Sequence, residues 1–259
     1  MMSEPNDEGL VRIIGPGALG LGVVNMVVGA GIFALPGLVA AQLGPAAILA
    51  YFACSVVVAL VFLCFAEIGS RISRSGGSYA YVEEALGPFA GFVASLLFWF
   101  GFSALADAAI TVVMVDSLAV VLPILDQPVP RALFIITLLA FLATVNVRGV
   151  RQGVRLYVFN TLVKLVPLVL LLVVGLFQVD LSNFAIPEWP TAATFGAGTV
   201  LLFYAFNGAE SSLNASGEIR DSARTVPRGL LLGLSGVLLL YVGLQTVSQG
   251  VLGAELANN

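Results

Sequence analysis

Long apolar segments separated by short polar stretches make up almost the whole chain. Seven of them are close to or above the roughly 20 residues that a helix needs to cross a bilayer. They cover about residues 12–42, 44–70, 88–122, 131–147, 154–178, 191–219 and 227–252. Between the second and the third, SYAYVEEALG places tyrosines and leucine on one side of a helix and Glu83 and Glu84 on the other. This pattern predicts a short helix at the membrane surface.

Two of these spans contain residues that do not fit a continuous membrane helix. The first span reads GAGIFALPG over residues 29–37, and the sixth reads FNGAE over residues 206–210. A broken helix in lipid exposes amide and carbonyl groups that cost several kcal/mol each unless something satisfies them. We therefore expect breaks near residues 28–32 and 206–209 that line a cavity, with Pro36 also disfavouring helix at Leu35. For the first break, a kinked span or a close helix–helix contact is the alternative.

The breaks predict what would bind there. Free amides at a helix start carry partial positive charge and attract a carboxylate. Free carbonyls at helix ends, near Val27 and from Tyr204 to Asn207, suit an ammonium or a sodium ion. An amino acid is the simplest ligand of that shape. Because the two broken spans lie five spans apart, they also indicate inverted repeats of five spans each.

Composition supports the membrane assignment. The chain is 59% hydrophobic and only 10% charged, whereas soluble domains carry about a quarter charged residues. It is therefore expected to be an all-α polytopic membrane protein. There is no histidine, which removes the usual general base and pH switch. With no GxxxxGK[ST] motif and no nucleophile–base pair, we expect neither an enzyme nor a cofactor, metal or nucleic-acid partner.

The arginines predict the orientation. All but Arg131 fall on one side of a seven-span arrangement. They are Arg12, Arg71, Arg74, Arg148, Arg151, Arg155, Arg220, Arg224 and Arg228. By the positive-inside rule this side faces the cytoplasm, so the N-terminus is expected to be cytoplasmic in a plasma-membrane protein. Residues 1–11 would form a cytoplasmic tail, residues 12–254 the membrane region and residues 255–259 part of an outer loop.

Three charged residues inside the spans are candidates for coupling or gating. Lys164 is the only lysine and lies midway through the fifth span. A lysine there costs about 2.5–3.5 kcal/mol and should face the protein interior. It could exchange a proton during transport, act as a permanent cation or be structural. Glu210 starts the inner half of the sixth span, where it could instead cap the helix. Asp107 could meet a cationic substrate or pair within the protein.

Several motifs together resemble the amino acid–polyamine–organocation superfamily of permeases. They are GAGIFALPG, RSGGSYAYVEEALGPFAGF, the lysine of the fifth span, FYAFNGAES and GEIRDSARTVPRGL. The resemblance implies a leucine-transporter-like five-plus-five inverted-repeat fold, with the first repeat and two spans of the second present here. It also implies secondary active transport of amino acids or related amines by alternating access, coupled to protons or to exchange.

The resemblance also implies a set of site residues. The substrate carboxylate would meet the amides of Ala30 and Gly31, and the ammonium would meet carbonyls at the ends of the inner and outer halves. Phe203 and Tyr204 would form an aromatic wall or gate. The substrate-binding set is Val27, Gly29, Ala30, Gly31, Phe203, Tyr204, Asn207 and Gly208. Lys164 would match a lysine linked to coupling or affinity, and Glu210 an acidic position of members that handle cations.

Two departures from the superfamily keep alternatives open. Asp221–Ser222 replaces the usual asparagine–proline after the sixth span. Members have about twelve spans, so we expect a chain truncated after the seventh, with a missing second half or a partner chain. One alternative is a cationic amino acid or polyamine antiporter, which Glu210 and Asp107 would favour. The other is a partner-dependent membrane protein that binds a ligand without transporting it.

Overall fold

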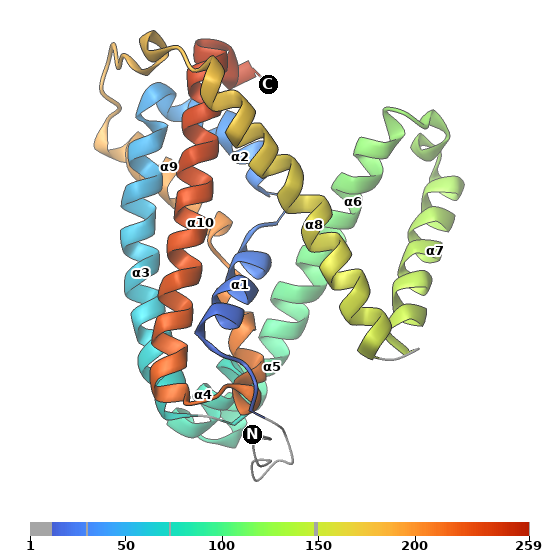
Figure 1. Cartoon of the computed structure of the whole chain (residues 1–259). Coiled ribbons are helices and arrows are strands. Elements are labelled where there is room, and N and C mark those ends of the chain that lie inside the picture. Colours follow the sequence, from blue (N-terminus) through green and yellow to red (C-terminus); the bar gives the residue numbers. More distant parts are fainter. Residues whose placement is uncertain (1–11, 30, 73, 148–149, 259) are drawn as a thin grey trace. The chain divides into compact units, whose positions relative to one another are not determined.

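The computed structural model describes residues 12–29, 31–72, 74–147 and 150–258, and these are almost entirely helical (Figure 1). The chain forms two compact units. The first unit comprises residues 1–92 and 167–259, and the second comprises residues 93–166. The candidate binding residues at both predicted breaks belong to the first unit.

The first unit is built around one long helix. Helix α10 (Ser222–Leu252) packs along both α1 (Pro16–Val27) and α3 (Ala47–Arg71). Helices α2 (Gly31–Leu43) and α9 (Ala192–Ala205) complete this group and pack against each other. Figure 1 shows α3 and α10 side by side, with α1 next to α10.

Glycines let α10 approach α1 closely. Gly229 and Gly233 lie four residues apart on α10 and face α1. A Cβ atom on Gly233 would lie 2.4 Å from Cβ of Val23, and one on Gly229 would lie 2.6 Å from a methyl carbon of Leu19. Small residues at this spacing allow membrane helices to pack backbone to backbone, where dispersion contacts hold them together. The α1–α10 contact therefore depends on the absence of these side chains.

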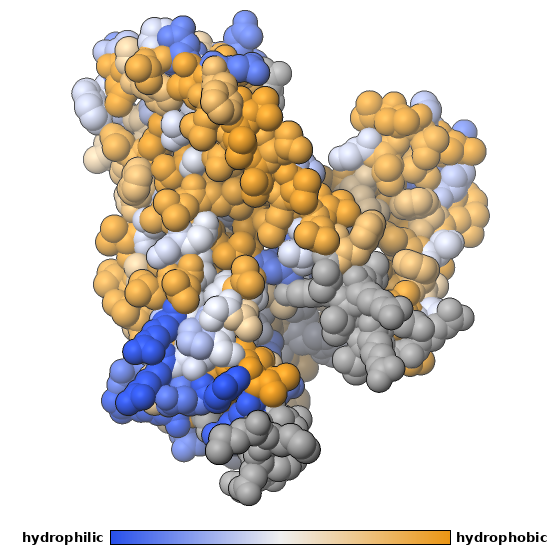
Figure 2. Space-filling view, viewed as in Figure 1, coloured by the Kyte–Doolittle hydropathy of each residue, from blue (hydrophilic) through white to orange (hydrophobic). Residues whose placement is uncertain are grey.

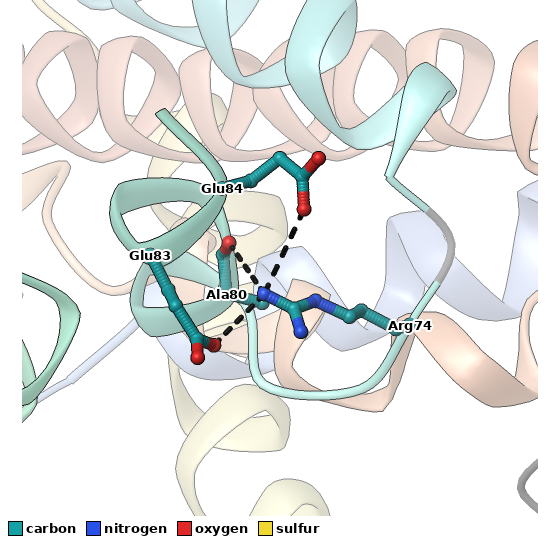
Figure 3. A network of polar contacts seen from close by, with 4 residues as sticks. All are labelled: Arg74, Ala80, Glu83 and Glu84. Carbon is teal, nitrogen blue, oxygen red and sulfur yellow. Dashed lines mark hydrogen bonds and ion pairs between the residues drawn. The ribbon is translucent and has the colours of Figure 1, made fainter. Parts of the chain in front are cut away.

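A network of hydrogen bonds and ion pairs lies at one end of the first unit. The short helix predicted after the second span is present as α4 (Ser78–Leu86). Arg74 donates to Glu83 at 2.8 Å and to the Ala80 carbonyl at 3.3 Å, and Glu84 lies 3.9 Å away (Figure 3). The exposed Arg71 also pairs with Glu67, four residues before it on α3.

The same end holds η6 (Ala209–Glu218), the helical turns that follow the second break. The Gly76 amide donates to the Asn214 carbonyl at 3.1 Å, and the Gly217 amide donates to the Ser75 hydroxyl at 3.3 Å. Ile14 forms a parallel bridge with Ile219. The loop before α4 and the segment before α1 are thus both fixed to the sixth-span region.

The second unit contains α6 (Leu105–Ala119) and α7 (Pro128–Val147). They are preceded by a run that includes the end of α5 (Pro88–Leu96) and η2, a π-helix over Leu97–Ala104. Helix α8 (Val150–Gly175) begins in this unit and continues into the first. Arg131 pairs with Asp116 at 2.7 Å, which gives the one arginine expected on the outer side an acidic partner.

The chain is an all-α polytopic membrane protein. Six helical stretches in the described residues are long and apolar enough to cross a membrane. They are Gly31–Arg71, Pro88–Ala119, Pro128–Val145, Phe159–Gln178, Ala192–Glu218 and Ser222–Asn258. The predicted count of seven differs because the first predicted span is divided. Its first half is the shorter apolar helix α1, and its second half, α2, continues into α3 within the single stretch Gly31–Arg71.

The expectation that Pro36 disfavours helix at Leu35 was wrong. Helix α2 runs through both residues, which are buried, and the break lies earlier in the chain. Proline removes a single helical hydrogen bond. Ending the helix there would leave more backbone groups unpaired in lipid, so continuing through Pro36 is the less costly solution.

Replacing Gly233 by alanine is expected to destabilise the protein by about 1–3 kcal/mol, the usual cost of overpacking. Gly22→Ala on α1 is the matched control, because a Cβ there meets nothing within 4 Å and alanine favours a helix. Thermal unfolding of the detergent-purified variants measures both effects. Equal melting temperatures for the two variants would contradict the close α1–α10 packing.

Candidate functional site

The two predicted helix breaks exist and lie against each other. Helix α1 ends at Val27 and α2 begins at Gly31, while α9 ends at Ala205 and η6 begins at Ala209. Gly208, with φ of +111°, lies in the second break. A Cβ atom on Gly208 would lie 2.8 Å from the carbonyl oxygen of Met26. The backbone of the second break therefore packs directly on the end of α1.

Tyr241 of α10 joins the ends of both interrupted helices. Its hydroxyl lies 3.1 Å from the carbonyl oxygen of Val27 and 3.1 Å from that of Ala205. Only 1% of Tyr241 is exposed. Its ring also packs edge-on against Phe206, with the ring centroids 5.3 Å apart. A buried side chain thus satisfies carbonyls that lose their helical partners where α1 and α9 stop.

The predicted residues of the first break differ in their surroundings. Val27 is buried and its carbonyl accepts from Tyr241. Gly29 is exposed, and Gly31, half-buried, is the first residue of α2. Ala30 lies outside the described residues. The carbonyl end of α1 and the amide end of α2 are therefore separated by three residues.

The predicted residues of the second break also differ in burial and in hydrogen bonding. The Tyr204 carbonyl accepts from the Asn207 amide at 3.3 Å, and the Tyr204 residue is 59% exposed. Phe203, Asn207 and Gly208 are half-buried. The aromatic side chain that is buried at the break is Phe206, at 2% exposure.

Glu210 lies in the first turn of η6. Its carboxylate accepts a hydrogen bond from the Gly208 amide at 3.1 Å. A carboxylate at a helix start is favoured because the unpaired amides there carry partial positive charge. The half-buried side chain of Glu210 thus bonds the backbone of the second break, which favours the capping alternative, and its coupling role stays a prediction.

Lys164 and Asp107 belong to the second unit. Lys164 is half-buried on α8. Asp107 is exposed in the first turn of α6, where its carbonyl accepts from the Thr111 hydroxyl at 2.7 Å. The coupling roles expected of both residues remain predictions.

Sequence reasoning missed Tyr241, Phe206 and the Ala205 carbonyl. A signal was available, because Tyr241 is a lone polar-tipped residue within the apolar run LLLYVGL. A buried tyrosine hydroxyl usually finds a hydrogen-bond partner. The pattern could not tell which groups it would reach, since Val27 lies 214 residues away in sequence.

These features define a membrane protein in which two interrupted helices meet at one buried point. A family model described as amino acid permease matches residues 19–259. The chain belongs to this family.

The curated relatives that match this chain are longer than it. The serine/threonine exchanger SteT of Bacillus subtilis is 29% identical over 96% of this chain and 57% of its own length. The mouse b(0,+)-type amino acid transporter 1 is 27% identical, over 85% and 47%. The Escherichia coli cadaverine/lysine antiporter is 26% identical, over 88% and 52%. The chain spans about half the length of the curated relatives it matches.

Gly208→Ala is expected to destabilise the contact between the two breaks. Alanine is strained at φ of +111°, which costs of order 1–3 kcal/mol, and its Cβ would meet the Met26 carbonyl. Gly196→Ala on α9 is the control, because its Cβ meets nothing within 4 Å. Thermal unfolding should show a lower melting temperature for Gly208→Ala alone. A melting temperature equal to that of the control would contradict the packing of Gly208 on α1.

Proposed function

We propose that the chain is part of a secondary active transporter that moves amino acids or related amines across the plasma membrane by alternating access. The observation that carries this proposal is the meeting of the α1–α2 and α9–η6 breaks at Tyr241. The family supports it. Helix ends that meet at mid-span supply the opposite partial charges that a zwitterion needs.

In the proposed site, the amides at the start of α2 bind the substrate carboxylate. The carbonyl of Val27 binds the ammonium, because a charged donor makes a stronger hydrogen bond to that oxygen than the neutral hydroxyl of Tyr241 does. Gly29 and Gly31 allow the substrate to approach the backbone closely. Phe203 and Tyr204 would cover the ligand from the side of α9.

The proposed orientation places the arginine-rich end of the first unit in the cytoplasm. Arg71 is the last residue of α3, and Arg224 and Arg228 lie in the first turns of α10. Figure 2 shows hydrophilic residues gathered at the end of the first unit where α4 lies, with apolar residues covering the middle. By the positive-inside rule, the N-terminus would also be cytoplasmic.

A second candidate is an antiporter of cationic amino acids or polyamines. The half-buried carboxylate of Glu210 beside the second break favours it, since a negative charge there could attract a second ammonium group. One relative is a cadaverine/lysine antiporter. The complete transporter would include a second half or a partner chain.

Ligand binding to this chain can be tested directly. The purified protein in lipid nanodiscs is heated with a panel of neutral amino acids, lysine, arginine and putrescine. A ligand at one hundred times its Kd should stabilise the protein by about 2.7 kcal/mol. Stabilisation by neutral amino acids supports the first candidate, and stabilisation by lysine or putrescine that Glu210→Gln abolishes supports the second.

Uptake into proteoliposomes then separates transport from binding. Accumulation of the stabilising amino acid, driven by a proton gradient or by the same amino acid inside, supports transport. Binding without accumulation would instead indicate a chain that needs a partner, and no stabilisation by any member of the panel would contradict the proposed function.

The coupling role proposed for Lys164 has its own test. Lys164→Ala should make uptake independent of pH. Lys164→Arg separates two roles, because arginine keeps a positive charge and does not release its proton. Uptake that stays active but pH-independent in Lys164→Arg indicates that the lysine exchanges a proton. Unchanged pH dependence in Lys164→Ala would contradict coupling through this residue.

A further inference from the structure

We infer that Tyr241 is a positioning residue whose hydroxyl links the two helix breaks. Through this link, a change in hydrogen bonding at one break alters the hydrogen bonding at the other. The functional part of this inference rests on the proposed function, while its structural part does not. Tyr241 lies on α10, outside both broken helices, and it reaches both of them from the same atom.

The Tyr241 hydroxyl can form a hydrogen bond with either of two carbonyl oxygens, so the contact involves more than packing. The hydroxyl has one proton and two acceptors at equal distance, the carbonyls of Val27 and Ala205. One proton cannot make two full hydrogen bonds. Either carbonyl can therefore take the stronger bond, and the site has two arrangements that differ only in which helix end Tyr241 holds.

Ligand binding would select between these arrangements. An ammonium group at the Val27 carbonyl would compete with the Tyr241 hydroxyl for that oxygen. The hydroxyl would then bond fully to the Ala205 carbonyl, which strengthens its hold on the end of α9. A ligand bound at the first break would thus change how strongly Tyr241 holds the end of α9 at the second break.

Helix α3, which packs against α10, offers a matched control. Tyr51 on α3 is 0% exposed, and its ring packs edge-on against Tyr241 with centroids 6.4 Å apart. Among the described residues, its hydroxyl has no hydrogen-bond partner. Tyr241→Phe and Tyr51→Phe therefore remove the same atom from two neighbouring buried rings, and only the first removes a bond to the breaks.

Hydrogen–deuterium exchange of the full chain in nanodiscs tests the structural part. Tyr241→Phe should speed exchange in peptides covering residues 22–32 and 202–212, because losing one hydrogen bond shifts a local opening equilibrium by roughly two- to tenfold. Tyr51→Phe should leave these peptides unchanged. Wild-type exchange in Tyr241→Phe, or equal acceleration in both variants, would overturn the inference.

The functional part is measured with the amino acid that stabilises the wild-type protein most. Tyr241→Phe should change its apparent affinity by roughly two- to tenfold, and Tyr51→Phe should not. Unchanged affinity in Tyr241→Phe overturns the link to ligand binding. Faster exchange together with no amino acid binding to any variant, wild type included, supports the tie between the breaks and overturns the proposed function.

Discussion

Backbone hydrogen bonding inside a bilayer is the constraint on which this structure depends. A helix that stops in the membrane leaves amides and carbonyls that lipid cannot satisfy, at several kcal/mol each. Here three of those groups, within the described residues, have internal partners. Tyr241 bonds the carbonyls of Val27 and Ala205, and the Glu210 carboxylate bonds the Gly208 amide. The breaks can persist because these partners are built into the fold.

Those partners arrive only because the helices pack closely. Gly229 and Gly233 let α10 lie against α1, and the same helix then carries Tyr241 to the end of α1 two turns further on. Gly208 serves the same purpose at the second break, where any side chain would meet the Met26 carbonyl. Without these glycines the broken helix ends could not share one buried hydroxyl, so close packing and polar satisfaction depend on each other.

Much of this could be predicted from the sequence, because a bilayer restricts what an apolar segment can do. GAGIF and FNGAE identified both breaks to within about two residues, as the ends of α1 and α9 show. The role of Tyr241 could not be predicted, because its partners are set by packing between distant segments. The effect of Pro36 was misjudged because a local preference at Leu35 was weighed without the cost of further unpaired groups in lipid.

The most direct test of the account is hydrogen–deuterium exchange of the wild-type chain with and without an amino acid that stabilises it. The account predicts slower exchange with ligand in peptides covering both the α1–α2 and the α9–η6 breaks, and no change in peptides from α7. Protection confined to one break, or found only away from both, would contradict the claim that the two breaks form a single binding site.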